Sequence, residues 1–394
     1  MPDPKPVAVV TTIYFRNSHA DVIAGKILEG LNYDGKNLYG LRVASMYVDQ
    51  FDDRDMSRDL AKKHGFRLCK TIDEALTLGT DKLAVDGVLS IGEHGQYPKS
   101  EKGQTLYPRR KFFEEITKTF VRVKRSVPVF NDKHLAAAWE DAKWMYDRAG
   151  ELMFPFLAGS TIPITWRKPD LKLPKNCELT DAVMLGYGPF EGYGFHALEG
   201  LQCMVERRKG GETGVKAVTA LSGDAMWTAL DRSEFSKELL EESIRRAPAH
   251  AKGDYRELTK KTKDAGVWLV EYRDGFKAAV AMLNGFLHEG DGGAFCFAGQ
   301  IKGEDKPRSC QFYLQQPDPY AHFGEQVKAI ESMINTGHPP YPVERTLLTT
   351  GILDAIMTSQ HTGGKRVETP HLKVAYQPTE WSHATGPIPK VIKR

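Results

Sequence analysis

The sequence predicts an α/β protein: an N-terminal Rossmann-like, doubly wound parallel sheet, then a C-terminal α+β domain with a large, mostly antiparallel open sheet. Three observations lead to this prediction. Over residues 1–155, apolar β-branched runs alternate with amphipathic segments, the pattern of repeated β-α units. After about residue 156, strand candidates follow one another without helices between them, as in an antiparallel sheet. A length of 394 residues suits two such domains, 1–155 and 156–394.

The first domain has clear local signals. The run "VAVVTTIY" is apolar and β-branched, as expected of a strand covered on both faces. Ser18 stands at an N-cap position with Asp21 three residues later, which predicts the start of a helix. Gly65 predicts a helix end, and Pro108 suits a first helical turn. In chain order, strands are expected at residues 7–14, 41–49, 66–69, 83–92 and 126–132, and helices at 18–31, 55–65, 71–76, 108–123 and 135–150.

The second domain begins after a proline-rich connection over residues 158–174. A strand and a helix come first, then several long strand candidates, then two more helices. The strands are expected at residues 178–188, 214–223, 266–274, 276–286, 293–300 and 308–316, and the helices at 194–208, 322–337 and 343–360. The tail from residue 369 is broken by prolines, so we expect it to wrap the surface.

The composition bounds the function. A net charge of +3, without blocks of like charge, gives no reason to expect a nucleic-acid or membrane partner. Five scattered cysteines without a CxxC pair favour a reducing compartment over a disulfide framework or a cysteine zinc site. The N-terminus lacks a signal-peptide pattern and no run of eighteen apolar residues occurs, so we expect a cytoplasmic protein.

Four segments carry a resemblance to a known family: "DMSRDLAKKHGFRLCKTIDEALTLGTDKLAVDGVLSI", "VPVFNDKHLA", "GYGFHALEGL", and the closing stretch from "HFGEQVKAIESMINTGHPP" to "ILDAIMTSQHTGGKRV". Together, over most of the chain, they resemble the glucose-fructose oxidoreductase, inositol dehydrogenase and MocA (Gfo/Idh/MocA) family. The resemblance implies an NAD(P)-dependent oxidoreductase acting on a sugar or cyclitol. It also implies a homo-oligomer formed through the open C-terminal sheet.

The sequence departs from the family at three motifs. The turn after the first strand, "TTIYFRNS", lacks the glycines of Gly-x-Gly-x-x-Gly, which allow a backbone to approach a pyrophosphate. The family's Glu-Lys-Pro is replaced by Asp132, Lys133 and His134. In the family's Asp-x-Gly-x-His-x-x-Asp motif the first acid is replaced by Gly192, with Glu191 beside it, whereas the rest of the pattern is kept.

Polar side chains follow four of the predicted parallel strands, and ligands bind at the carboxyl edge of such sheets. These side chains are Asn17, Ser18 and His19, then Asp49 and Gln50, then Glu93 and His94, then Asp132, Lys133 and His134. For the cofactor, the helix start at Ser18, with Asn17 and His19, is a candidate phosphate site, and Asp49 a candidate ribose anchor. The alternative is that Ser18 only caps the helix and that Tyr14 and Phe15 fill the nucleotide space.

The candidate catalytic residues are Lys133, His196, Glu199, His94 and Glu93. Lys133 is expected to lower the pKa of a substrate hydroxyl, and His196 to take the alcohol proton, its ring oriented by Glu199 three residues later. The alternative is that Lys133 is solvated and His196 is packed among aromatic side chains.

The candidate substrate contacts are Asp132, His134, Arg167 and Trp166, the last two as an arginine and an aromatic face for a sugar. The alternative is that Asp132 only caps a helix and that Trp166 and Arg167 belong to a structural linker. A basic stretch, "ERRKGGETG", could bind an anion or a sugar, although such a stretch is more often an exposed turn.

We therefore predict an NAD- or NADP-dependent sugar or cyclitol oxidoreductase. The alternative is a metal-dependent carbohydrate lyase, epimerase or hydrolase that has lost its dinucleotide. Its divalent ion would take ligands from His19, Glu93, His94, Asp132, His134, His196 and Glu199. A third possibility is a sugar-binding or scaffold protein on an inactive oxidoreductase fold.

Overall fold

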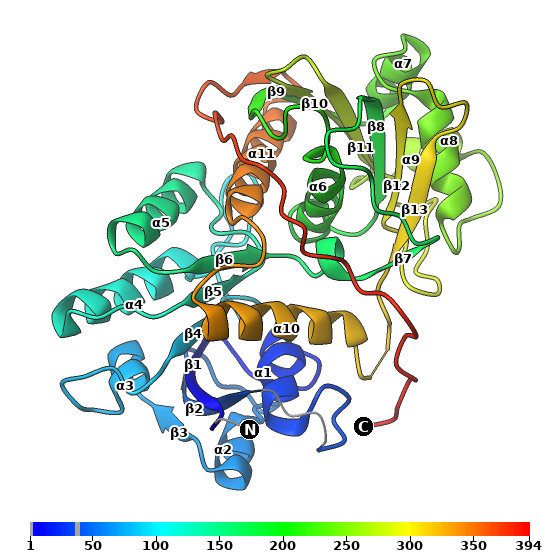
Figure 1. The fold of residues 1–394 in the computed structure, drawn as a ribbon. Helices are drawn as coiled ribbons and strands as arrows, with labels where there is room; N and C mark the ends of the chain where they lie inside the picture. Colours follow the sequence, from blue (N-terminus) through cyan, green and yellow to red (C-terminus); the bar gives the residue numbers. More distant parts are fainter. Residues whose placement is uncertain (1–2, 36–39) are drawn as a thin grey trace.

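The computed structural model describes residues 3–35 and 40–394. The chain forms two sheets with helices packed around them (Figure 1). The first sheet is parallel, with strand order β3-β2-β1-β4-β5-β6. Its strands are β1 (Lys5–Thr11), β2 (Leu41–Val48), β3 (Arg67–Cys69), β4 (Gly87–Ile91), β5 (Val129–Asp132) and β6 (Phe156–Gly159).

The helices between these strands confirm the predicted β-α alternation. They are α1 (His19–Glu29), α2 (Ser57–His64), α3 (Ile72–Thr77), α4 (Arg109–Val123) and α5 (Trp139–Glu151). Ser18 and Thr71 cap α1 and α3 through their side-chain oxygens, and Gly65 ends α2 at a φ of 73°. The first sheet also receives a helix from far along the chain, since α10 (Ala321–Thr336) packs against α1.

The second sheet has the strand order β14-β9-β10-β11-β8-β12-β13-β7. All neighbours are antiparallel except β8 and β11, which run parallel. The strands are β7 (Trp166–Lys168), β8 (Leu179–Gly186), β9 (Val215–Leu221), β10 (Gly266–Tyr272), β11 (Lys277–Met282), β12 (Cys296–Ile301), β13 (Arg308–Tyr313) and β14 (Val367–Glu368). The helices α6 (Gly192–Val205) and α11 (Glu344–His361) pack on one another and against this sheet.

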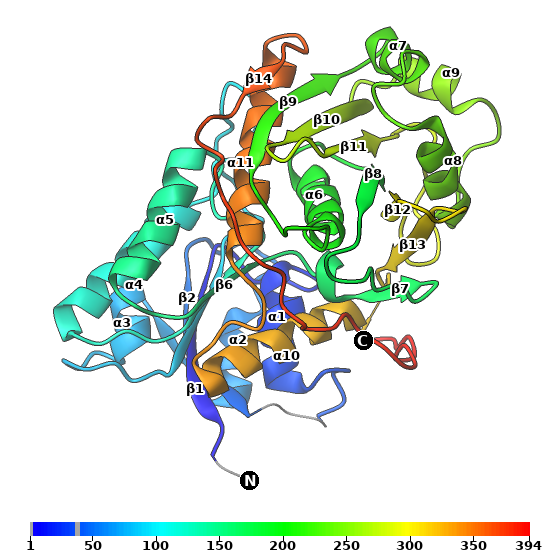
Figure 2. The same ribbon diagram turned by 45° about the horizontal axis from the view of Figure 1, so that its top comes forward.

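One prediction about this domain is wrong. Three helices lie between β9 and β10, where consecutive strands were expected: α7 (Asp224–Asp231), α8 (Lys237–Arg246) and α9 (Tyr255–Lys260). Ser236 caps α8, whose buried Leu239 and Leu240 face β8, β12 and β13. Figure 2 shows α8 on the side of the sheet opposite α6. The cap and the amphipathic spacing of α8 are local signals that the prediction overlooked, whereas α7 and α9 have only 8 and 6 residues, too few for a clear helical period.

The tail runs back across both domains (Figures 1 and 2). Trp166 Nε1 donates to the carbonyl of Gly386 at 3.1 Å, and Arg394 forms an ion pair with Asp21 in the first turn of α1. No helix in residues 3–35 and 40–394 is long and apolar enough to cross a membrane.

Candidate functional site

A cleft of about 360 Å³ lies where the carboxyl ends of β1, β4 and β5 meet α6 and α10. Four of its lining residues, Asn17, His94, Lys133 and Tyr320, have positive φ angles of 63°, 67°, 64° and 48°. Residues other than glycine rarely adopt this backbone conformation, because it is strained. Strained residues are often found at functional sites, where the surrounding structure stabilises them. The other polar or ionisable residues that line the cleft are His19, Glu93, Thr161, Tyr187, Tyr193, His196, Gln316 and His322.

Glu93 is the anionic centre of the cleft. Its Oε2 accepts a hydrogen bond from Arg109 Nη2 at 2.6 Å, and its Oε1 lies 3.5 Å from Lys133 Nζ. Burial acts to raise the pKa of Glu93, but the charges of Lys133 and Arg109 outweigh it and hold that pKa below its ordinary value. Glu93 is therefore a carboxylate that fixes the Lys133 ammonium at the cleft wall.

Two of the predicted substrate contacts, Asp132 and His134, are not among the residues that line the cleft. Asp132 is buried, and its Oδ2 bonds His19 Nδ1 at 2.7 Å. His134 is also buried, with Nε2 2.8 Å from Arg109 Nη1, and burial followed by the Arg109 charge holds its pKa well below the usual value. Asp132 contacts His19 and His134 contacts Arg109, so both residues support other side chains around the cleft. Their placement does not support the prediction that they contact substrate.

His196 faces Lys133 across the cleft from the start of α6, and Ser160 fixes its ring. Ser160 Oγ lies 2.6 Å from His196 Nδ1 and accepts the backbone N–H of Ile162 at 3.0 Å. With Ile162 as its donor, the hydroxyl can give its own hydrogen to Nδ1. That arrangement leaves the proton of a neutral ring on Nε2. Burial, then the Lys133 charge, lowers the pKa of His196 well below 6.5, so the neutral ring is the form to expect.

Glu199 was predicted to orient His196 directly, and that contact is wrong. Its Oε1 accepts from the hydroxyls of Thr346 at 3.2 Å and Thr349 at 2.6 Å, and its Oε2 accepts from Ser160 N at 3.3 Å. The i, i+3 spacing places His196 and Glu199 on neighbouring positions of α6, but Glu199 points into the core beneath β6. It therefore supports the backbone of Ser160, and only through Ser160 the ring.

Two further histidines line the cleft as neutral groups. Burial, with the His19 charge, lowers the pKa of His94 to about 4, and burial, with the Lys26 charge, lowers that of His322 to about 3. His94 Nε2 and His322 Nδ1 are buried without a hydrogen-bond partner in the part of the chain that the structure describes. Buried polar atoms of this kind are normally satisfied, so they are contacts open to a ligand.

The turn after β1 does not fit a pyrophosphate in the arrangement that Rossmann folds use. Its own side chains already take the backbone donors that a phosphate needs. The Asp21 carboxylate accepts from Asn17 N at 2.8 Å, and Ser18 Oγ accepts from Phe15 N at 3.2 Å and Asp21 N at 3.3 Å. Asp21 in turn pairs with the Arg394 guanidinium. These three backbone donors are therefore not available to cradle a phosphate.

The rest of the predicted cofactor site is also occupied. Asp49 Oδ1 accepts from Tyr47 and Oδ2 from Tyr97, each at 2.7 Å, so each oxygen already has one donor from the protein. The alternative prediction was that Tyr14 and Phe15 fill the nucleotide space. Tyr14 is fully buried beneath the turn, whereas Phe15 faces a hollow and its ring stacks with Arg54. His19 and Asn17 line the cleft.

Trp166 and Arg167 lie away from the cleft, on β7 at the edge of the second sheet. Trp166 packs with Tyr313 and the tail, and Arg167 is buried against Cys203. The alternative, a structural role for this segment, agrees with their placement.

Metal binding is not supported either. In residues 3–35 and 40–394 no group of three or more His, Cys, Asp or Glu side chains is placed to hold a metal ion. Four of the seven proposed ligands bond each other or Arg109, since His19 bonds Asp132, and Glu93 and His134 bond Arg109.

The sequence did not point to three residues of this site. Arg109, directly after Pro108, reads as an ordinary charged residue of an amphipathic helix, yet it is only 1% exposed. Ser160 lies in the connection that looked structural. His322 begins α10, and only the packing of α10 on α1 brings it to the cleft.

The two sheets and the helices around them form an α/β fold that is found in other solved structures. The sequence matches no protein-family profile and no curated protein. Solved structures do match. GenD2 from gentamicin A biosynthesis, in complex with NAD, has a TM-score of 0.56 and 15% identity, with 93% of this chain and 97% of that one covered.

Two other solved structures give the same picture. Scyllo-inositol dehydrogenase from Lactobacillus casei, with NAD(H) and scyllo-inositol, has a TM-score of 0.56 and 11% identity, covering 93% and 99% of the two chains. A probable dehydrogenase from Thermotoga maritima has a TM-score of 0.57 and 11% identity over the same shares. At such identities the likeness shows the fold, which matches the Gfo/Idh/MocA dehydrogenases.

Proposed function

We propose that this chain is an oxidoreductase acting on a hydroxyl or carbonyl group of a sugar- or cyclitol-like substrate. The observation that carries the proposal is that the Lys133 ammonium and a neutral His196 line the same cleft, with Glu93 beside the ammonium. A cleft of about 360 Å³ lined by histidines, tyrosines and amide side chains suits a small polyol.

The chain's own residues can handle the substrate proton. The Lys133 ammonium and the Nε2–H of His196 are both donors, so together they can bind one substrate oxygen and stabilise the charge that develops on it. In the oxidative direction, the neutral amine form of Lys133 takes the proton of the substrate hydroxyl as the hydride leaves to the proposed acceptor, while the Nε2–H of His196 stabilises the oxygen. In the reductive direction, Lys133 supplies the proton that the new hydroxyl needs.

Nicotinamide dinucleotide is the proposed hydride partner, because two of the similar structures carry NAD or NAD(H). The turn after β1 does not fit its pyrophosphate, so no residue of this chain is assigned to it.

The test is a thermal-shift titration with NAD(H) and NADP(H), followed by a dinucleotide-linked absorbance assay with inositols and hexoses. We expect a saturable rise in melting temperature and turnover with at least one polyol. Replacing Lys133 by Met should lower kcat/KM by about 10²–10⁴-fold, the usual contribution of a positioned acid or base. Lys111→Met, an exposed lysine on α4, is the matched control and should leave the rate unchanged. Absence of both a dinucleotide shift at millimolar ligand and any dinucleotide-dependent turnover would refute the proposal.

A further inference from the structure

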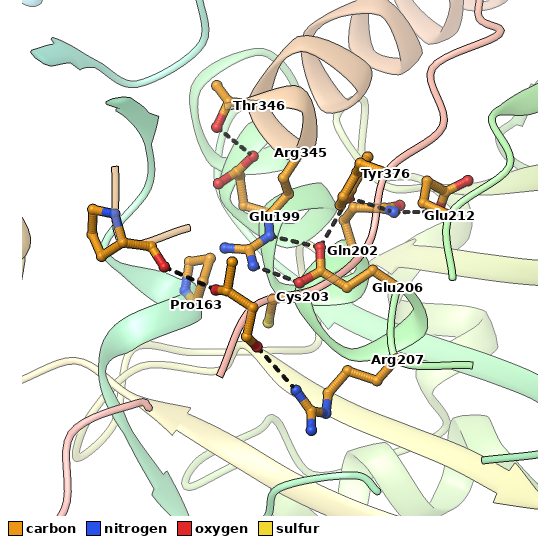
Figure 3. A network of polar contacts seen from close by, with 12 residues as sticks. Pro163, Glu199, Gln202, Cys203, Glu206, Arg207, Glu212, Arg345, Thr346 and Tyr376 are labelled. Atoms are coloured by element: carbon orange, nitrogen blue, oxygen red, sulfur yellow. Dashed lines mark hydrogen bonds and ion pairs between the residues drawn. The ribbon is translucent and has the colours of Figure 1, made fainter. Parts of the chain in front are cut away.

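A second cavity lies at the far end of α6 from His196. It is enclosed by the last turn of α6, the segment around β7, the start of α11 and the tail (Figure 3). Its volume is about 30 Å³, which is room for about two water molecules. The cleft residues do not line it, and the proposed function makes no use of it.

The charges around this cavity do not balance. Four cationic side chains line it, those of Arg167, Lys172, Arg207 and Arg345, against one carboxylate, that of Glu206. Glu206 is already committed, because it pairs with Arg345 through two contacts, at 2.8 Å to Nε and 2.5 Å to Nη2. Figure 3 shows this pair, with Tyr376 also donating to Glu206. Three cations therefore remain without a buried partner of opposite charge.

Arg167 is the clearest case. It is 9% exposed, and its Nη1 and Nη2 donate only to the backbone carbonyls of Leu171 and Pro163, with Cys203 Sγ nearby at 3.7 Å. Its Nε is buried and has no acceptor, and among the described residues no carboxylate lies within 4 Å. Its guanidinium also lies over the Phe312 ring, with Cζ 5.2 Å from the ring centroid. A buried guanidinium with no carboxylate beside it is costly, so such a group calls for an explanation.

Arg207 approaches the same cavity from the end of α6. It is largely buried, and its Nε donates to the carbonyl of Leu173 at 2.6 Å. Its nearest carboxylate, Glu380, lies 3.9 Å from Nη2 on a side chain that is 65% exposed and also pairs with Lys172. Arg207 Nη1 also donates to a tail carbonyl, that of Thr379, at 3.5 Å. The stretch "ERRKGGETG", for which an exposed turn was one expectation, is therefore buried at its basic end.

We propose that this cavity binds a small oxoanion of the phosphate or sulfate type, held between Arg167 and Arg207 with Lys172 at the rim. Guanidinium groups present paired donors that match the oxygens of such an ion. The small volume admits an inorganic ion or an equally small acid and excludes a nucleotide. The bound ion neutralises the two arginines and stabilises the junction of α6, β7 and the tail.

The test is a titration of the full chain with inorganic phosphate in HEPES buffer, at constant ionic strength, followed by melting temperature and calorimetry. We expect a saturable rise in melting temperature with phosphate and with sulfate, and a smaller one with the same ionic strength of chloride. Arg167→Met and Arg207→Met should each weaken phosphate binding at least tenfold.

Two control variants make the result specific. Arg245→Met removes an exposed arginine paired with Glu242 and should leave the phosphate Kd within twofold. Lys133→Met should do the same, which excludes binding in the cleft. Should a methionine variant fail to fold, Arg207→Lys keeps the charge but loses the paired donors, and should still weaken binding. The proposal is overturned by the absence of a saturable shift, by an equal response to chloride, or by binding that survives both arginine substitutions.

Discussion

The buried guanidinium of Arg109 should be the strongest single support of the cleft, and replacing it by Met tests this. It contacts Glu93 at 2.6 Å and His134 at 2.8 Å, and its charge is more than nine-tenths shielded from water. Without it, His134 Nε2 loses its partner, and Glu93 keeps only the longer contact of 3.5 Å to Lys133.

The expected loss of folding free energy is about 3 kcal/mol. Removing one partner of a buried ion pair usually costs about 3–5 kcal/mol, because the other charge stays buried. Lys133 offsets part of this for Glu93, so the lower end of the range applies. Met keeps most of the side-chain volume, so the cavity left behind contributes little.

The assay is guanidinium chloride unfolding followed by circular dichroism, with Lys111→Met as the control on the same helix. That variant removes an exposed charge and should change the unfolding free energy by less than about 0.5 kcal/mol. The double variant with Arg109→Met and Glu93→Gln should lose less unfolding free energy than the two single variants lose together, by about 1 kcal/mol or more. A loss below about 1 kcal/mol for Arg109→Met, or strict additivity in the double variant, would contradict the reasoning.

Two further outcomes follow from the same geometry. The folded pKa values of His94 and His322, about 4 and about 3, lie below the ordinary 6.5, so below pH 6.5 the unfolded chain binds protons that the folded chain does not. As the pH is lowered from 6.5 to about 4, the free energy of unfolding should therefore fall by about 1.4 kcal/mol per pH unit for each histidine. His322→Phe should flatten the curve of melting temperature against pH. An unchanged slope would count against this reasoning. Gly194→Ala should destabilise α6 by about 1–3 kcal/mol in denaturant unfolding, because the added Cβ meets the Trp268 ring at 2.1 Å. Gly192→Ala, which meets no atom within 4 Å, is the control, and equal effects of the two would show that the packing at Gly194 is looser than it looks.

The sequence alone determined the β-α alternation, the caps at Ser18 and Thr71, and the edge at which polar side chains gather. These features depend on local spacing and on the rule that parallel strands share one carboxyl edge. That rule was enough to bring His19, Glu93, His94 and Lys133 to one cleft. Of the three helices that were missed between β9 and β10, α7 and α9 are too short to give a clear helical period, whereas the cap and the amphipathic spacing of α8 were overlooked.

Only the tertiary structure decided which partner each site residue takes. Arg109 and Glu93, Ser160 and His196, and Asp21 and Arg394 meet because separate elements pack together, and nothing in local spacing encodes those contacts. The same holds for the basic end of "ERRKGGETG". Its charges are compatible with an exposed turn, and only the tail and α11, packed against the end of α6, bury Glu206 and Arg207 beside a common cavity, whereas Lys209 remains exposed. Local sequence sets which groups can form contacts, whereas burial among distant segments sets which of them lack a partner.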